Sequence, residues 1–137
     1  MGIAVDTPDG LIVPVVKNAD IKSIMDIAKE IQDLAAKAQS RKLDLADIKG
    51  YSFTITNIGA IGGIHATPII NWPDVAIMAT GKIYDKVVFK DDKIMVRKYM
   101  PFSIAFDHRV VDGAEVARFA NAMKQNLEDP EMLLLQK

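Results

Sequence analysis

The stretch that decides the fold is FSIAFDHRVVDGAEVARF, residues 102–119. Its first five residues form an apolar run of strand length, and from Gly113 onward the apolar residues recur at helical spacing. The segment between these two patterns contains Asp107, His108 and Asp112. A histidine placed between a strand end and a helix start has neighbours that can fix its tautomer and tune its pKa, which makes His108 a candidate functional residue.

The same stretch allows a purely structural interpretation. His108 is flanked by Asp107, Arg109 and Asp112, so it could be one member of a cluster of ion pairs. From the motif alone, a catalytic base and a structural histidine are equally good hypotheses.

Upstream, GIAVD and LIVPVV are short β-branched runs separated by TPDG, whose residue order is typical of a tight turn. They predict a β-hairpin. Apolar residues then recur at helical spacing over 21–38, which predicts a long helix with Asp20 as its N-cap. Because the first strand pattern begins almost at Met1, we expect the chain to start inside a domain.

In the middle of the chain, LADIKG predicts a short helical turn closed by Gly50, and YSFTITNI predicts a strand. Strand alternation places Thr54 and Thr56 on one face of it. A second strand is predicted in DVAIMATGKI, and KVVFKDDKIMVRKY predicts a hairpin around Asp91 and Asp92. We expect MPFSIAF to extend the second arm of that hairpin, and a final helix to span 113–127.

Composition limits the function. The chain has 137 residues, which is the length of one domain, and a net charge of −1 without a basic stripe, so neither nucleic acid nor an anionic membrane is an expected partner. It has no cysteine and therefore no thiol nucleophile of its own. No window approaches the about 18 apolar residues of a membrane span, and the N-terminus lacks a signal-peptide pattern, so we expect a soluble intracellular protein.

Two other kinds of site are disfavoured. GAIGG, residues 59–63, follows a strand as a phosphate-binding loop would, but the proline-containing IHATPIINWP that comes next has no helical period. His65 and His108 are the two histidines of the chain, and neither has a second nitrogen or sulfur ligand at a metal-binding spacing. We therefore expect no metal.

The stretch FDHRVVDGAEVARF resembles the DHR-x-x-DG motif of the dihydrolipoamide acyltransferases, the acyltransferase core components of 2-oxo acid dehydrogenase complexes. GIAVDTPDGLIVPVVKNAD, FTITNIGAIGG, TPIINWPDVAIMATGKI and DPEMLLL resemble consecutive blocks of the same catalytic domain, in the same order. The resemblance implies an α/β (α+β) fold in which a mixed sheet is flanked by helices, as in the chloramphenicol acetyltransferases. The bare His-x-x-x-Asp-Gly pattern is less specific, since it also occurs in other acyltransferases.

The resemblance implies acyl transfer between the thiols of dihydrolipoamide and coenzyme A. His108 matches the general base of the family, and Thr56 matches the hydroxyl that stabilises the oxyanion, although serine is the commoner residue there. Asp112 matches a residue that orients the histidine loop through hydrogen bonds and an ion pair. Gly113 is expected to permit a close turn at the site.

The resemblance also implies an assembly. Family members form trimers whose active site lies in a channel between two subunits, so that His108 and Thr56 would come from neighbouring chains. Coenzyme A and a lipoyl group, carried by a separate domain, enter from opposite ends. C-terminal residues of the family join trimers into a cage, the role expected for residues 132–135.

A complete family domain is longer at its N-terminal side, so we expect residues 1–137 to be the C-terminal portion of a single acyltransferase catalytic domain, truncated at its N-terminus. Lipoyl domains, and domains that bind the dehydrogenase and dihydrolipoamide dehydrogenase components, would lie elsewhere. The expected compartment is the cytoplasm, or the mitochondrial matrix in a eukaryote. Acetyl, succinyl and branched-chain enzymes share these motifs, so the acyl group is left open.

Two alternatives accompany this hypothesis. The first is a scaffold fragment that assembles but transfers nothing. The second is an antibiotic acetyltransferase on the same fold, which is disfavoured because the other blocks follow the pattern of the dehydrogenase complexes.

Overall fold

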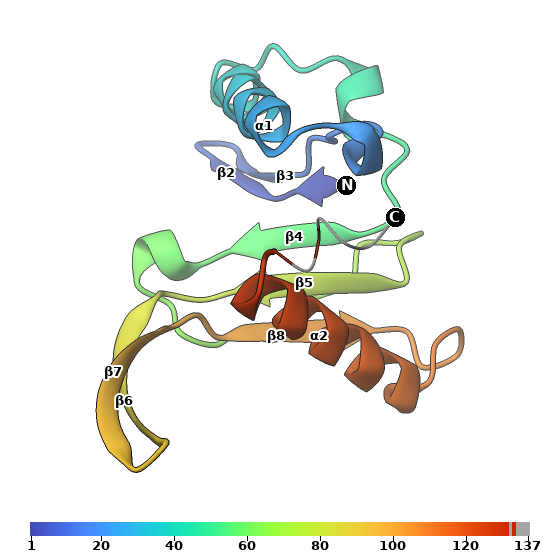
Figure 1. Ribbon diagram of the computed structural model, residues 1–137. Helices are drawn as coiled ribbons and strands as arrows, with labels where there is room; N and C mark the ends of the chain where they lie inside the picture. Colours follow the sequence, from blue (N-terminus) through green and yellow to red (C-terminus); the bar gives the residue numbers. More distant parts are fainter. Residues whose placement is uncertain (132, 134–137) are drawn as a thin grey trace.

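The centre of the fold is a four-stranded mixed sheet in the order β1-β4-β5-β8 (Figure 1). In this computed structural model, which describes residues 1–131 and 133, β1 (Gly2–Ile3), β4 (Thr54–Asn57) and β5 (Ala76–Thr80) run parallel. The edge strand β8 (Phe102–Phe106) runs antiparallel to β5. The expected mixed sheet flanked by helices is confirmed.

A small hairpin and a long helix lie beside the β1 edge of the sheet (Figure 1). The hairpin pairs β2 (Val5–Thr7) with β3 (Gly10–Ile12), as the TPDG turn predicts. The helix α1 (Ile24–Gln39) lies over it and buries two side chains on its apolar stripe. Together with the segment that follows β3, the helix forms a local core of Val15, Val16, Leu34 and Ala38.

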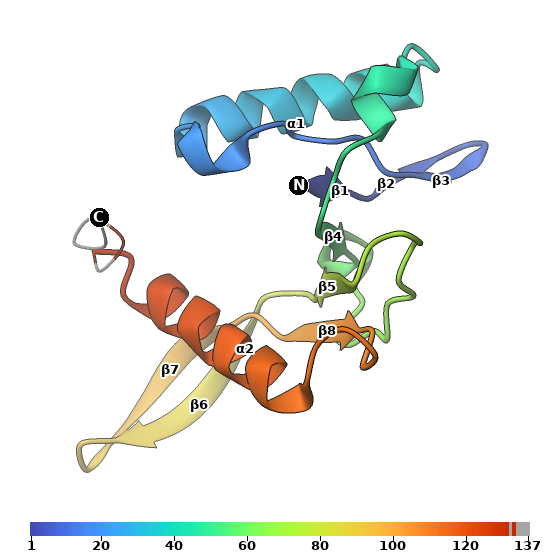
Figure 2. The same ribbon diagram turned by 90° about the vertical axis from the view of Figure 1, so that its right-hand side faces the viewer.

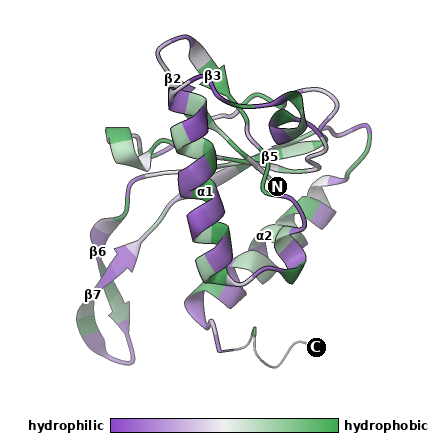
Figure 3. Ribbon diagram, turned by 90° about the horizontal axis from the view of Figure 1, so that it is seen from above, coloured by the Kyte–Doolittle hydropathy of each residue, from purple (hydrophilic) through white to green (hydrophobic). Residues whose placement is uncertain are grey.

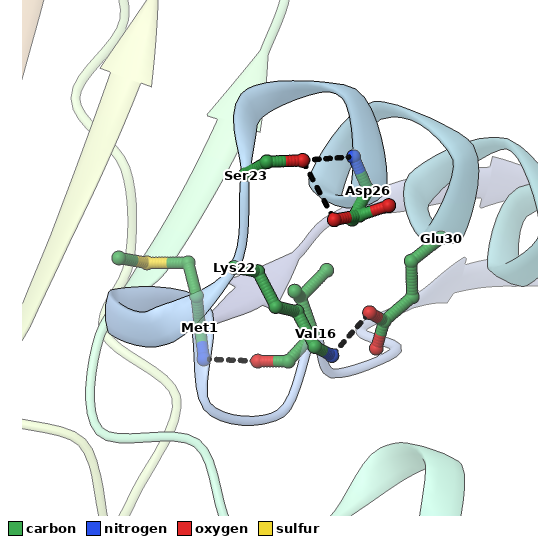
Figure 4. Close-up of polar contacts among 6 residues, drawn as sticks. All are labelled: Met1, Val16, Lys22, Ser23, Asp26 and Glu30. Carbon is green, nitrogen blue, oxygen red and sulfur yellow. Dashed lines mark hydrogen bonds and ion pairs between the residues drawn. The ribbon is translucent and has the colours of Figure 1, made fainter.

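The start of α1 differs from the prediction. Asp20 lies inside a short 3₁₀ turn (Ala19–Ile21), and the N-cap is Ser23, whose hydroxyl accepts a hydrogen bond from the Asp26 amide at 3.1 Å (Figure 4). The prediction of Asp20 was wrong because the chain first makes a 3₁₀ turn at Ala19–Ile21 and then becomes extended at Lys22 and Ser23, so that Ser23 is the residue directly before the helix. Lys22, before the helix, forms an ion pair with Glu30 on the second turn of α1 (Figure 4).

A second 3₁₀ turn, η2 (Leu45–Ile48), follows α1, and a third, η3 (Gly59–Ile61), follows β4. The turn η2 confirms the helical turn predicted from LADIKG, and Gly50, which follows it, has a φ of 80°. At η3 the glycines permit close contact: a Cβ at Gly59 would lie 2.7 Å from the backbone of Gly81. The GAIGG segment therefore packs against the end of β5.

The hairpin of β6 (Tyr84–Lys90) and β7 (Lys93–Tyr99) forms as predicted, with Asp91 and Asp92 at φ of 52° and 57°. It extends away from the main sheet in both side views (Figures 1 and 2). The prediction that MPFSIAF continues its second arm was wrong. Pro101 has no N–H to offer a ladder, so the pairing ends at Tyr99, and β8 instead pairs with β5.

The last helix, α2 (Gly113–Glu128), confirms the predicted helix and crosses beside β8 (Figures 1 and 2). Phe119 of α2 contacts Phe53, just before β4, with ring centroids 5.9 Å apart. In the tail, Leu133 is about half exposed. Met132, Leu134 and Leu135, for which cage contacts are expected, lie outside the described residues.

The chain exposes more surface than a compact protein of its mass. Its accessible surface is 10148 Å² at 15.1 kDa. The scaling relation for folded monomers gives about 7,100 Å² for this mass, so about 3,000 Å² is in excess. An area of this size is within the range that obligate protein interfaces bury. Neither of the two described α-helices has the length and hydropathy needed to cross a membrane.

Candidate active site

His108 lies in the turn that joins β8 to α2. The backbone carbonyl of Asp107 accepts hydrogen bonds from the amides of Val110 and Val111, both at 3.0 Å, and so closes the turn around the histidine. The imidazole is exposed and its ring centroid lies 5.5 Å from that of Phe106. No hydrogen bond from the part of the chain that the structure describes reaches this ring. Its reactive nitrogens are therefore open to a ligand.

Gly113 keeps space beside the ring. A Cβ at this position would lie 3.8 Å from Nε2 of His108, which is ordinary van der Waals contact. A side chain at this position would begin in contact with the ring, so the glycine leaves space beside Nε2.

Asp107 and Arg109, on either side of His108, form an ion pair. The guanidinium donates to both carboxylate oxygens, at 2.9 Å from Nε to Oδ1 and 2.7 Å from Nη2 to Oδ2. The Arg109 amide donates to Oδ1 as well. These hydrogen bonds lower the pKa of Asp107 from 3.8 to about 2, so the pair stays charged at neutral pH.

Asp112 is the N-cap of α2 and forms a capping box with Glu115. Its amide donates to the Glu115 carboxylate at 3.4 Å. The position fixes where the helix begins, and with it the end of the His108 turn. Among the described residues Asp112 has no ion pair, and it makes no hydrogen bond to His108.

Thr56 lies on β4, half-buried, on the same face as the buried Thr54. Both line a groove of about 660 Å³ together with Ile77 of β5. The far wall is the segment 66–71, which includes Pro68, Ile69 and Ile70. No role for this segment was predicted from the sequence, although the two prolines and three isoleucines of IHATPIINWP are a signal for a fixed apolar wall.

The structure does not bring Thr56 and His108 together within one chain. In the sheet register Thr56 pairs with Ala79, which pairs with Ser103, whereas His108 follows Phe106 at the other end of β8. Standard strand geometry places Phe106, at the end of β8, about 10 Å from Thr56 along the strands and about 10 Å across them, and His108 lies two residues beyond Phe106. The hydroxyl of Thr56 therefore cannot act at the imidazole of its own chain.

Within residues 1–131 and 133, no three His, Asp or Glu side chains are grouped as a metal site would require. His65 lies in a different groove, between the base of the β6–β7 hairpin and the end of α2, where Tyr84 and Tyr99 are neighbours.

The comparisons with known proteins agree on one family. A family profile described as 2-oxoacid dehydrogenases acyltransferase (catalytic domain) matches residues 1–135. The dihydrolipoyllysine-residue acetyltransferase component of the pyruvate dehydrogenase complex of Bacillus subtilis is 48% identical over 136 residues, which are 99% of this chain. The chain spans 31% of the length of that relative.

Solved structures show the same likeness. The dihydrolipoamide acetyltransferase of Azotobacter vinelandii, studied for the roles of a serine, a histidine and an asparagine in its catalytic mechanism, superimposes with a TM-score of 0.94 at 44% identity. The match covers 97% of this chain and 55% of that one. The cubic core of a pyruvate dehydrogenase multienzyme complex matches equally well, with a TM-score of 0.94.

The spacing of the three residues studied in the Azotobacter enzyme recurs here. Its serine lies fifty-two positions before the histidine and its asparagine four positions after it. Thr56, His108 and Asp112 have the same spacing in this chain.

Proposed function

Because this chain belongs to the family of 2-oxoacid dehydrogenase acyltransferase catalytic domains, we propose that it transfers an acyl group between dihydrolipoamide and coenzyme A in a 2-oxo acid dehydrogenase complex. The observation that carries the proposal is an exposed histidine in a hydrogen-bonded turn, with a threonine and an aspartate at the spacing of the residues studied in the Azotobacter enzyme. The relatives named above are acetyltransferase components, so acetyl is the first acyl group to test.

His108 is the general base. A thiol with a pKa of about 8.5 is only a few per cent thiolate at neutral pH, and a neutral imidazole at hydrogen-bond distance removes this limit by accepting the proton. The thiolate then attacks the thioester carbonyl. When the tetrahedral intermediate collapses, the C–S bond to the leaving group breaks and the imidazolium returns its proton to the departing sulfur. No covalent bond forms between the acyl group and the protein at any step.

Thr56 is the oxyanion donor. The tetrahedral intermediate carries a negative oxygen, and a hydroxyl fixed in advance at that position lowers the barrier. A threonine in place of the serine of the Azotobacter enzyme keeps the donor. Its additional methyl group restricts the rotamer, which β4 and the groove wall further limit.

The two residues act from different subunits. Since Thr56 and His108 of one chain are separated along and across the sheet, a complete site needs His108 of one subunit and the Thr56 side chain of another. The excess accessible surface supports such contacts, and a relative of the same fold forms a cubic core. We assign the chain to a homotrimer that builds a larger cage, with Asp112 holding the His108 turn in each subunit.

The groove that contains Thr56 fits an aliphatic arm. Its described walls are formed by apolar side chains with a few neutral polar groups, and no charged side chain lines it. A lipoyl arm or the pantetheine arm of coenzyme A presents such a chain near its sulfur, whereas the coenzyme A phosphates need a cationic surface elsewhere.

Residues 1–137 act in this proposal as the C-terminal portion of a single acyltransferase catalytic domain. Lipoyl domains and the dehydrogenase partners bind through other parts of the complex. The compartment is that of the complex: the cytoplasm of a bacterium, or the mitochondrial matrix of a eukaryote.

The test compares the two histidines. His108→Ala in the assembled protein should lower kcat for acetyl transfer from acetyl-coenzyme A to dihydrolipoamide by about 10³-fold or more, the size of effect expected when a proton-transfer group is removed. His65→Ala, the matched control in a separate groove, should leave kcat unchanged. Particle mass should be the same in all three proteins. A particle that shows no turnover, or turnover that His108→Ala leaves intact, would support the scaffold alternative.

A second pair of variants tests the oxyanion donor. Thr56→Val removes the hydroxyl and keeps the shape, so kcat should fall by about 10²-fold or more. Thr56→Ser keeps the hydroxyl and should retain most of the activity. Equal losses in both variants would assign the residue to packing and contradict the role in catalysis.

A further inference from the structure

The two buried polar side chains in the described part of the chain bind each other. Thr54 is 1% exposed and Asp74 is 8% exposed. The Thr54 hydroxyl donates to Oδ2 of Asp74 at 2.9 Å, from β4 to the segment that enters β5. A polar pair is costly to bury, so its position in the sheet calls for an explanation beyond packing.

The segment that contains Asp74 also holds the start of the His108 turn. The next residue, Val75, accepts a hydrogen bond through its carbonyl from the amide of Asp107 at 2.8 Å. Asp107 in turn closes the turn through its own carbonyl and binds Arg109 through its carboxylate. A continuous series of contacts thus leads from Thr54 through Asp74, Val75 and Asp107 to His108.

We propose that Thr54 and Asp74 are a positioning pair for His108: their buried hydrogen bond fixes the Val75 carbonyl, which fixes the backbone at Asp107 and the direction of the imidazole. Neither side chain contacts the ring, and Thr54, although it lies in the wall of the groove beside Thr56, is 1% exposed and presents almost no surface to a ligand there. The inference rests on the proposed function in assigning proton transfer to His108. A base displaced by about 1 Å from its proton can lose about 10²-fold in rate. A fixed Val75 carbonyl, which holds the residue directly before His108, would prevent such a displacement.

Three variants separate positioning from simple stability. Thr54→Val and Asp74→Leu each keep the approximate shape but leave the other member buried without its partner, which destabilises the protein. The double variant Thr54→Val, Asp74→Leu leaves no polar group unpaired, so it should regain most of the stability. Positioning predicts that kcat falls by about 10- to 100-fold in all three with little change in KM. If the pair serves only stability, kcat recovers in the double variant together with the melting temperature.

The matched control is Ser52→Ala, an exposed residue two positions before Thr54. It should change neither kcat nor the melting temperature. If a single variant fails to fold, kcat and the melting temperature of the double variant still distinguish positioning from stability.

NMR signals of the His108 imidazole provide a measurement that does not depend on turnover. The two histidines give two sets of ring signals in an NMR spectrum of histidine-labelled protein, and His65→Gln assigns them. In the double variant the His108 signals should shift, because the turn beside Phe106 is no longer anchored, while the His65 signals stay in place. Unchanged His108 signals, or a wild-type kcat in the folded double variant, would overturn the positioning role. If the wild-type protein transfers no acyl group, the proposed function fails, and the His108 signals still decide whether the pair controls the ring.

Discussion

The central strand β5 and the β6–β7 hairpin both carry apolar side chains, but these side chains have opposite environments. On β5, Ile77, Met78 and Ala79 are less than a tenth exposed, because β4 and β8 flank the strand on both sides. On one face of the hairpin, apolar residues of the two strands pair directly, yet each is 63–78% exposed: Val87, Phe89, Ile94 and Val96. Figure 3 shows these apolar segments in green along the hairpin.

The two regions therefore differ in what stabilises them: one has a buried core within the chain, and the apolar face of the other is exposed in the single chain. The sheet and the α1 region have their own buried cores, whereas an isolated two-stranded hairpin is marginally stable in water. Four neighbouring apolar side chains on one face of the hairpin are each more than 60% exposed, and the chain as a whole exposes more surface than a folded monomer of its mass. We expect another copy of the chain to cover this face in the assembled protein.

The largest expected effect is in the sheet. Ile77→Ala should reduce the free energy of unfolding by about 2–5 kcal/mol, because it leaves a cavity that the flanking strands cannot fill. The matched variant Ile94→Ala, in the hairpin, should cost less than about 1 kcal/mol in the dissociated chain. Urea unfolding of both variants measures the difference. Equal costs would show that the two regions are stabilised in the same way.

A second prediction concerns assembly. Val87→Ser combined with Val96→Ser should weaken subunit association by about tenfold or more, since the pair would no longer bury apolar surface at the interface. Lys90→Ser at the hairpin tip is the control, and it should associate normally. Sedimentation velocity over a range of concentrations provides the measurement. Normal association of the double variant would leave the hairpin without a role in the assembly.

The α1 region provides a smaller, local effect. Ser23→Ala removes the N-cap hydrogen bond and should cost about 1 kcal/mol of unfolding free energy. Asp20→Ala, at the position predicted from the sequence, should cost much less, because Asp20 does not cap the helix. Thermal unfolding compares the two, and a larger loss for Asp20→Ala would contradict the observed start of α1.

The smallest effect concerns the ion pair beside His108. Because the folded state lowers the pKa of Asp107 from 3.8 to about 2, ionised Asp107 stabilises the fold above pH 3.8, and this contribution disappears as the pH falls through 2. Asp107→Asn should therefore be less stable than the wild type at pH 6 and equally stable below pH 2. A stability difference between Asp107→Asn and the wild type that does not change between pH 6 and 2 would show that the ionisation of Asp107 does not contribute to the stability of the fold. Arg109→Gln should show the same pH dependence as Asp107→Asn.

Sequence patterns predicted most of the elements and fewer of their connections. The β2–β3 and β6–β7 hairpins and both helices follow from local turn and periodicity signals, which need no distant partner. The pairing of β8 with β5 was missed because a strand that closely follows another can either extend a hairpin or join a different sheet. The one local signal for the second arrangement is Pro101, which lies between β7 and β8.

The candidate site shows the same limit. The family resemblance named Thr56, His108 and Asp112 and implied that Thr56 and His108 act from different chains, but only the register of three strands gives the physical reason, which is the separation of these two residues within one chain. The Thr54–Asp74 pair was missed for the same reason: twenty residues separate its members, and only the parallel pairing of β4 and β5 brings them into contact.

The most direct test of the shared site is complementation. His108→Ala and Thr56→Val subunits, each inactive alone, are co-expressed with different tags, and mixed particles are purified on both tags. A site built from His108 of one subunit and Thr56 of another predicts recovery of about one quarter of the wild-type turnover per subunit for random mixing around a closed ring. Mixed particles that remain as inactive as the two single variants would contradict a site shared between subunits.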